Sequence, residues 1–411
     1  MELAPKHTGL STGRLERITD HLERNYIASG KIAGCQVAVA RHGHLAYFRS
    51  FGQMDRERGK PMTDDAIFRI YSMTKPITSV ALMTLYERGY FQLNDPVSRF
   101  FPSWKQQRVW VSGRGADMQT EAPVRPVTMR DMLCHTGGLT YGAALVALGA
   151  EDSGHPVDAV YGEVGVRRGR GETLMEFMEK LAKVPLRYQP GERWMYSLST
   201  DVCGALVEKI SGQRFDRYLQ EAIFDPLGMK DTSFVVAPEK LDRFCANYRR
   251  AADKSLQLIA DADRDYLTEP SFYSGGGGLT GTTEDYLRFC EMVRRGGEFE
   301  GARILGPRTI KLMRQNHLKD GKDLTQMAIG GFSETANEGV GFGLGFACTL
   351  DAVKSGTISA GDFYWGGAAS TIFWVDDVDD LVVVFMTQLM PSGAFNFRGQ
   401  LKSIVYSSIV E

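Results

Sequence analysis

Runs of positive charge and long apolar stretches are both missing from this sequence. The 48 Lys and Arg residues and the 50 Asp and Glu residues give a formal net charge of −2, and the basic residues gather nowhere. Because nucleic-acid binding requires a concentrated basic surface, we predict no nucleic-acid partner. Apolar stretches such as Leu381–Met386 are far too short to span a bilayer, so we also predict no membrane partner.

Paired cysteines and a secretory signal are missing as well. The six cysteines lie far apart and form no Cys-x-x-Cys pair; they are Cys35, Cys134, Cys203, Cys245, Cys290 and Cys348. This spacing favours buried, reduced thiols in a reducing compartment. Residues 1–22 alternate charges with single apolar residues and contain no apolar signal core. Both observations predict a cytoplasmic location.

Metal-binding patterns are scarce too. The seven histidines include no His-Glu-x-x-His motif and no His/Asp cluster. One close pair, His42 and His44, flanks Gly43 between two apolar runs, and such a pair is typical of a hairpin tip. We therefore expect no metal and no cofactor.

Strand patterns occur near both ends of the chain. Four segments alternate apolar and polar residues or are rich in β-branched and aromatic residues: Cys35–Ala40, Leu45–Phe51, Thr371–Val375 and Leu381–Thr387. Helical spacing marks the two terminal segments, Ser11–Asn25 and Phe397–Val410. We therefore predict one antiparallel sheet built from both chain ends, with helices packed against it.

The middle of the chain has helical spacing and few strand patterns. Its predicted helices are Thr128–Leu133, Leu174–Lys183, Thr200–Ile210 and Asp216–Phe224. The prediction is an α+β fold in which residues 1–95 and 230–411 form the domain that holds the sheet, and residues 96–229 form an inserted, mainly helical domain. At 411 residues the chain is long enough for two such units.

A candidate nucleophile lies at the start of a strongly apolar segment. Phe68–Pro76 predicts the opening of an amphipathic helix that ends at Gly89. Ser72 and Lys75 are three residues apart, so both side chains would share one face at the helix start. A serine attacks when a base takes its proton, and a lysine serves as that base when burial or a positive field leaves it neutral. The helix N-terminus adds free N–H donors for a developing oxyanion.

This Ser-x-x-Lys spacing is weak when taken alone. A chain of this composition contains about one such match by chance, and here there is one. The alternative is that Ser72 caps the helix and Lys75 faces solvent. Further motifs along the chain decide against that alternative.

Two more motifs follow the first in the order of a known family. Phe68–Pro76, Leu133–Leu139 and Pro190–Ser197 together resemble the motifs of class C β-lactamases and their esterase relatives, among which the family VIII carboxylesterases are the most similar. The likeness runs from about Ile32 to Gln388. It implies a β-lactamase-like fold and membership in the penicillin-binding-protein-like serine hydrolase superfamily.

By this resemblance the catalytic residues are Ser72, Lys75 and Tyr196, and Tyr196 is the general base or acid that also protonates the leaving alcohol. The residue types agree, because a phenol near a lysine ammonium loses its proton more readily and can relay protons. The alternative for Tyr196 is a core tyrosine with a satisfied hydroxyl.

The sequence departs from the β-lactamase pattern at two places. Leu198 stands where an asparagine normally follows the tyrosine, and Trp365-Gly366-Gly367-Ala368 stands where Lys-Thr-Gly is usual. Both changes remove polar groups that hold the β-lactam amide and carboxylate, so a less charged ester is the expected substrate. The glycines would let the strand approach the acyl carbonyl, and the oxyanion hole would consist of the Ser72 and Ala368 N–H groups.

Several other segments have two interpretations. Lys354-Ser355-Gly356 is an alternative third motif, although it lies in a Ser/Gly-rich turn. Gly9–Gly13 and Gly276–Gly281 match an esterase and a dinucleotide motif, but we interpret them as a helix cap and as a tight turn near the active site. The aromatic residues that could line an acyl pocket, or simply belong to the core, are Tyr141, Trp194, Phe272, Tyr273 and Trp365.

We therefore predict a serine carboxylesterase that hydrolyses short-to-medium acyl esters through an acyl-enzyme on Ser72, with a small-molecule ester as its partner. Three alternatives remain open at this stage. The same intermediate would serve an acyltransferase, weak β-lactamase action is possible chemically, and the fold could recognise penicillin-like ligands without turnover. The sequence leaves the oligomeric state open.

Overall fold

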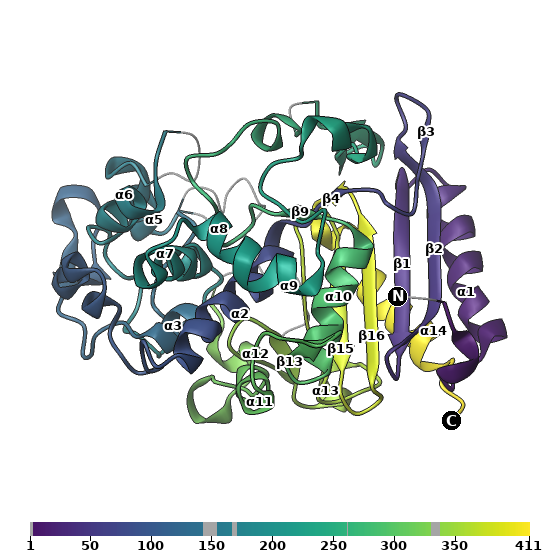
Figure 1. Cartoon of the computed structure of the whole chain (residues 1–411). Helices are drawn as coiled ribbons and strands as arrows, with labels where there is room; N and C mark the ends of the chain where they lie inside the picture. Colours follow the sequence, from purple (N-terminus) through teal and green to yellow (C-terminus); the bar gives the residue numbers. More distant parts are fainter. Residues whose placement is uncertain (1–2, 143–153, 167–170, 261, 330–337) are drawn as a thin grey trace.

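The two ends of the chain meet in one antiparallel sheet (Figure 1). The computed structural model describes residues 3–142, 154–166, 171–260, 262–329 and 338–411. Its large sheet has eight strands in the order β12-β13-β14-β15-β16-β1-β2-β3. The strands are β1 (Gly34–Arg41), β2 (His44–Asp55), β3 (Lys60–Pro61), β12 (Val340–Phe342), β13 (Ala347–Thr349), β14 (Phe363–Gly366), β15 (Ile372–Asp376) and β16 (Leu381–Thr387). The predicted sheet from both chain ends is confirmed.

The central strand pair joins residues that are more than 300 positions apart in the sequence. β1 pairs with β16 from Cys35 opposite Thr387 to Arg41 opposite Leu381, and every residue of both strands is buried. Both faces are therefore covered. The terminal helices α1 (Thr12–Leu22) and α14 (Phe397–Tyr406) pack together beside β2, and α10 (Thr283–Arg294) packs on β16, β1 and β15 (Figure 1).

Two short motifs have the structural roles that we expected. Ser11 is the N-cap of α1, and its side chain accepts a hydrogen bond from the Arg14 N–H, so the esterase-like pentapeptide is a helix cap. His42 and Gly43, with φ of 54° and 76°, form the tight turn between β1 and β2. His42 therefore lies in the turn and His44 begins β2, so this histidine pair marks a hairpin tip.

The middle of the chain is mainly helical, as predicted, and it occupies the left side of Figure 1. Its helices are α3 (Met129–Leu133), α5 (Pro156–Glu163), α6 (Leu174–Leu181), α7 (Ser199–Ser211), α8 (Phe215–Leu219), a π-helical turn Gln220–Phe224 and α9 (Asp225–Leu227). A small hairpin of β5 (Val109–Ser112) and β6 (Gln119–Glu121) also lies here. The sequence pattern missed it because its strands have only four and three residues, too few to show a clear alternation. The boundaries at residues 96 and 229 stay a prediction.

The remaining elements are short. They are β7 (Tyr248–Arg250), β8 (Leu256–Leu258), β17 (Leu389–Met390), β10 (Glu298–Phe299), β11 (Ala302–Arg303), α11 (Pro307–Met313), α12 (Leu324–Met327) and α13 (Ala352–Ser355). Lys354 and Ser355 end α13, and Gly356 follows with φ of 65°. The alternative third motif is therefore the end of a helix, whereas Trp365 lies in strand β14. No helix in the described ranges is long and apolar enough to cross a membrane.

One predicted boundary is wrong. Phe68 and Arg69 do not open a helix; they form strand β4, which pairs with β9 (Thr280–Gly281). A 3₁₀ turn over Tyr71–Met73 follows, and helix α2 runs over Thr74–Glu87. The apolar spacing of Phe68–Pro76 is compatible with a helix or a strand. Phe68 and Arg69 form a strand because they pair with a segment about 200 residues later in the chain, which a local sequence pattern cannot show.

Arg69 fixes this strand from inside the protein. The side chain is fully buried, and it donates hydrogen bonds to the Cys245 carbonyl at 2.6 Å and to Gln388 Oε1 at 3.2 Å. It also pairs with Asp263 and lies 3.9 Å from the centroid of the Phe244 ring. Since Arg69 directly precedes the turn that carries Ser72, these contacts hold the start of the candidate nucleophile segment.

We expect the substitution Arg69→Met to lower the free energy of unfolding by about 2–4 kcal/mol, because it removes the side-chain donor from the buried Cys245 carbonyl and leaves Asp263 without its ion-pair partner. Urea denaturation would measure the change. Arg58→Met is the matched control, since the Arg58 side chain is 71% exposed and its loss should cost less than about 0.5 kcal/mol. Equal stability of the two variants would contradict the role given to Arg69.

Candidate active site

Ser72 lies at a strained corner between β4 and α2. Tyr71, the residue before it, has φ of 42°, a left-handed conformation that is costly for a bulky residue. The Tyr71 hydroxyl is held by a hydrogen bond from Asn247 Nδ2 at 2.9 Å. The corner turns Ser72 into the first turn of a 3₁₀ helix, where its backbone N–H has no intrahelical acceptor.

The Lys75 amine is buried beside the Ser72 hydroxyl. Lys75 is 2% exposed, and its Nζ lies 3.2 Å from Ser72 Oγ, to which it donates a hydrogen bond. A second hydrogen bond runs from Nζ to the Gly276 carbonyl at 2.6 Å. The alternative of a solvent-facing lysine is therefore wrong. The contact with Gly276 also places the glycine-rich segment as a tight turn beside this amine, as expected.

Tyr196 joins the pair from the loop before α7. Its ring centroid lies 4.5 Å from Lys75 Nζ, and the residue is 3% exposed. The Trp365 indole N–H donates a hydrogen bond to the Tyr196 hydroxyl at 3.3 Å. The structure thus brings together the three side chains that the sequence singled out, from a corner, a helix and a loop.

Gly367, which follows strand β14, packs against the segment before Ser72. A Cβ atom on Gly367 would lie 2.5 Å from the Ile70 carbonyl oxygen, so only glycine permits this approach to the segment before Ser72. The Gly367 and Ser370 N–H groups are used within the turn. Across the described ranges no acceptor is found for the N–H of Ala368, which is half-buried. This N–H and that of Ser72 are thus both available to an oxyanion.

His135 is a buried neighbour of Tyr196 whose role in the site the sequence did not indicate. Its ring centroid lies 5.1 Å from that of Tyr196, and its two ring nitrogens lie 3.3 Å from Ser197 Oγ and 3.4 Å from Thr200 Oγ1. Burial, with a smaller contribution from the Lys75 charge, holds the His135 pKa well below its usual range. The imidazole is therefore a neutral wall of the site. The sequence feature that could have indicated His135 is its position in the Leu133–Leu139 motif.

The other aromatic residues divide into two groups. The rings of Tyr141 and Trp365 lie 5.4 Å and 5.3 Å from the Tyr196 ring, and the ring of Trp194 stacks on it at 6.2 Å. Tyr273 instead donates a hydrogen bond to Glu269 at 2.7 Å, and its ring packs edge-on against Phe234 at 5.2 Å. Those contacts give no support to a place for Tyr273 in the acyl pocket, which stays a prediction.

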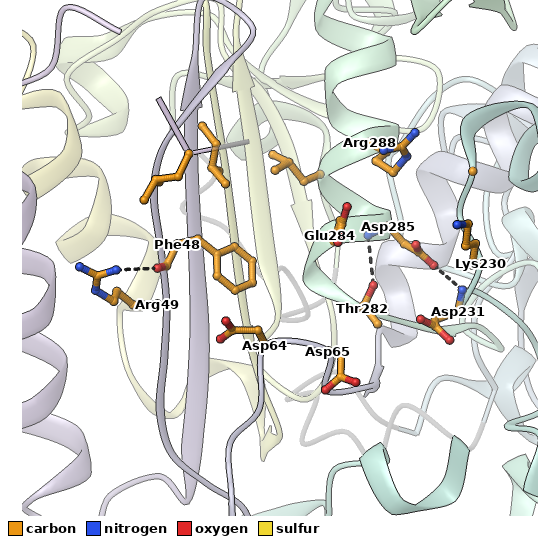
Figure 2. A pocket seen from close by; sticks show the side chains of 14 residues that line it. Phe48, Arg49, Asp64, Asp65, Lys230, Asp231, Thr282, Glu284, Asp285 and Arg288 are labelled. Carbon is orange, nitrogen blue, oxygen red and sulfur yellow. Dashed lines mark hydrogen bonds between the residues drawn. The ribbon is translucent and has the colours of Figure 1, made fainter. Parts of the chain in front are cut away.

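A separate cavity of about 610 Å³ lies between β2 and the start of α10 (Figure 2). Asp285 holds its wall: the carboxylate accepts hydrogen bonds from the Asp231 N–H and the Thr232 hydroxyl, both at 2.8 Å. Burial raises the pKa of Asp285 to about 6. None of Ser72, Lys75 or Tyr196 lines this cavity, so it is separate from the candidate active site.

No group of three or more His, Cys, Asp or Glu side chains that could hold a metal ion occurs in the described ranges. The polar groups at the candidate site are a hydroxyl, an amine, a phenol and backbone N–H groups. A serine hydroxyl in contact with a buried amine, with a phenol ring 4.5 Å from the same amine, is a combination that nucleophilic acyl transfer can use.

The chain belongs to the beta-lactamase family, whose model matches residues 19–403. This match confirms the superfamily and the β-lactamase-like α+β fold that the motifs implied.

Individual relatives cover nearly the whole chain. Esterase EstB from Burkholderia gladioli is 31% identical over 410 residues, 95% of each chain. Acyltransferase calJ from Penicillium decumbens is 28% identical over 346 residues, 81% of this chain and 78% of its own length. Among solved structures, EstCE1, described as a hydrolase with promiscuous acyltransferase activity, superimposes with a TM-score of 0.79 at 27% identity and covers 96% of this chain and 99% of its own. The family VIII esterase branch is thereby confirmed as the right part of the superfamily.

The neutral His135 should make the fold sensitive to acid. In the unfolded chain His135 binds a proton below pH about 6.5, but in the folded protein it does not, so stability falls as pH falls through that value. We expect His135→Asn, which tolerates the φ of 59° at this position, to remove about 1–2 kcal/mol of the stability difference between pH 7.5 and pH 5. Urea unfolding at both pH values would measure it. The exposed His44→Asn is the control, and an identical pH dependence in all three proteins would contradict the prediction.

Proposed function

We propose that this protein is a serine carboxylesterase that hydrolyses short-to-medium acyl esters. The observation that carries the proposal is the 3.2 Å contact between the buried Lys75 amine and the Ser72 hydroxyl, with the Tyr196 ring 4.5 Å from the same amine. A buried amine in contact with a serine hydroxyl is a base placed on a nucleophile. The similarity to esterase EstB over almost the full chain supports the same activity.

Acylation begins when Ser72 Oγ attacks the ester carbonyl carbon. As the new C–O bond forms, the hydroxyl proton passes to the neutral Lys75 amine or, through it, to the Tyr196 phenolate. The carbonyl oxygen takes the negative charge, which the Ser72 and Ala368 N–H groups stabilise. When the tetrahedral intermediate collapses, the bond to the leaving alcohol breaks and Tyr196 returns the proton to that oxygen, which leaves an ester on Ser72.

Deacylation repeats these steps with water as the nucleophile. Lys75 and Tyr196 take a proton from the attacking water, the same two N–H groups hold the oxyanion, and Ser72 leaves with the proton restored. The carboxylic acid is then released. No metal or cofactor takes part in any step of this proposal.

The walls of the site favour an uncharged acyl group. Tyr141, Trp194 and Trp365 surround the Tyr196 ring, and Leu198, two residues after the tyrosine, is buried. Aromatic and aliphatic surfaces stabilise apolar groups by removing them from water. We therefore propose an apolar acyl ester in preference to a β-lactam, with a small-molecule ester as the substrate partner.

Acyl transfer to an alcohol is a second candidate. The relatives that favour it are acyltransferase calJ and the EstCE1 structure, whose description names both activities. The acyl-enzyme on Ser72 is common to both reactions, so the difference lies in whether water or an alcohol reaches it. Product analysis in the presence of a primary alcohol would separate them.

We also propose a cytoplasmic location. All six cysteines are buried and unpaired, and burial raises the pKa of thiols such as Cys35 and Cys290. Such thiols persist without oxidation in a reducing compartment.

The esterase proposal predicts a graded loss of activity on p-nitrophenyl butyrate. We expect Ser72→Ala to lower kcat by at least about 10⁴-fold and Lys75→Met by about 10³–10⁴-fold, because the nucleophile and its base act as a unit. Tyr196→Phe should lower kcat by about 10²–10⁴-fold, as for the loss of one general acid or base. Steady-state kinetics would measure each variant.

Ser79→Ala is the matched control for these variants, because Ser79 is a buried serine on the same helix α2. It should retain wild-type kcat. Mass spectrometry after treatment with a serine-directed phosphonate should place the label on Ser72. A label on another peptide, or a Ser72→Ala variant that remains active, would refute the assignment. A folded wild-type protein without turnover would favour a non-catalytic binding protein.

A further inference from the structure

The buried carboxylate of Asp201 binds the turn whose Gly276 carbonyl accepts a hydrogen bond from the Lys75 amine. Asp201 lies in the first turn of α7 and has no exposed surface. Its Oδ1 accepts hydrogen bonds from the Ser274 hydroxyl at 2.6 Å and from the Gly276 N–H at 3.0 Å. Both donors belong to the glycine-rich turn that follows Tyr273, so one side chain fixes two points of this turn.

The same turn is the acceptor for Lys75. The Gly276 carbonyl accepts the hydrogen bond from Lys75 Nζ at 2.6 Å, and the Gly275 carbonyl accepts one from the Thr78 hydroxyl of α2 at 2.8 Å. A Cβ atom on Gly276 would lie 2.7 Å from Asp201 Oδ2, so glycine is required for this contact. Asp201, Gly276 and Lys75 thus form one connected chain from α7 to α2.

We propose that Asp201 is a positioning residue for the reaction on Ser72: by holding the Gly276 carbonyl it fixes the Lys75 amine against the Ser72 hydroxyl, and its negative charge adjusts how readily that amine gives up its proton. The proposal rests on the proposed function, in which Lys75 is the base for Ser72. The side-chain hydrogen bonds of Asp201 are with Ser274 and Gly276 of this turn, so in this proposal it acts through Lys75.

The proposed reaction rate should depend strongly on the position of the Lys75 amine relative to the Ser72 hydroxyl. The Lys75 side chain has rotatable bonds, and the carbonyl of Gly276 is the acceptor that directs its end towards Ser72. A displacement of about 1 Å in a catalytic group can cost about 10²-fold in rate. A buried negative charge also favours the ammonium form of a nearby amine. Removal of the Asp201 charge should therefore let Lys75 become neutral at a lower pH, even where the turn keeps its place.

The other titratable groups around this chain include His135, Cys203, Tyr196 and Tyr141, whose ring centroid lies 5.8 Å from Lys75 Nζ. Burial, aided by the Lys75 charge, keeps the pKa of His135 well below its usual range, and burial, aided by the Asp201 charge, raises that of the Cys203 thiol. Neither changes its charge over the range in which an esterase is assayed. Tyr196 takes part in the reaction itself. A change in the acid limb of the rate profile on substitution of Asp201 would therefore report Lys75 and its phenol partner.

Two substitutions separate the charge from the hydrogen bonds. Asp201→Asn keeps an oxygen for the Gly276 N–H but removes the charge, and Asp201→Ala removes both. Asp285→Asn is the matched control, since Asp285 is another buried aspartate that accepts from one backbone N–H and one hydroxyl. The assays are kcat, KM and the pH profile of kcat/KM on p-nitrophenyl butyrate, and the rate at which a serine-directed phosphonate labels Ser72. Thermal unfolding confirms that each variant is folded at the assay temperature.

We expect Asp201→Asn to lower kcat about tenfold with KM within about twofold, and Asp201→Ala to lower kcat about 100-fold. In Asp201→Asn the acid limb of kcat/KM should move to lower pH by about half a unit or more, and the labelling rate should follow kcat. Asp285→Asn should leave all of these unchanged.

A folded Asp201→Asn protein with wild-type kcat, labelling rate and pH profile would overturn the proposal. So would a loss of activity that is equal in Asp285→Asn, because that would show a general effect of a lost buried aspartate. If the wild type labels rapidly but hydrolyses no ester, the esterase proposal fails while the labelling rates of the Asp201 variants still decide this one. A wild type inert to both reagents would refute both.

Discussion

The proposed chemistry of this protein depends on the position of one amine. Lys75 is buried, and its Nζ is held between the Ser72 hydroxyl and the Gly276 carbonyl at 3.2 Å and 2.6 Å. A lysine side chain loses several rotatable degrees of freedom when it is held in this way, and the fold supplies the compensating contacts. The Tyr196 ring lies 4.5 Å from the amine on another side. Every other feature of the site serves to bring these partners to the same point.

The long sheet explains how such distant segments can meet. β1 and β16 form its fully buried centre, and β14 with Trp365 lies two strands further along the same sheet. Arg69 links the strand before Ser72 to Gln388, which directly follows β16. The nucleophile segment and the Trp365–Ala368 segment are therefore tied to one rigid frame. A helix or loop alone would leave the oxyanion donors free to move relative to Ser72.

The sequence predicts the parts of this structure that depend on local pattern. The terminal hairpins, the helices of the middle region and the Ser72–Lys75 spacing follow from periodicity, since residues within a few positions decide them. It does not predict that Phe68 and Arg69 form a strand, because their partner, Thr280–Gly281, lies far along the chain. Nor does it indicate Asp201, a residue in an ordinary helix start that matters only because the fold packs it against Gly276.

The surroundings of Lys75 balance two opposite demands. The Gly276 carbonyl, the Tyr196 ring and the charge of Asp201 all favour an ammonium group, whereas burial favours the neutral amine. If only the groups that favour the ammonium acted, the amine would keep its proton throughout the reaction. If only burial acted, the amine would not accept a proton from Ser72. Because acylation takes a proton from Ser72 and the leaving alcohol then needs it back, a base of this kind must lie near balance. In the proposed mechanism the groups that act on this amine are fixed and buried, so they need not rearrange when the proton moves.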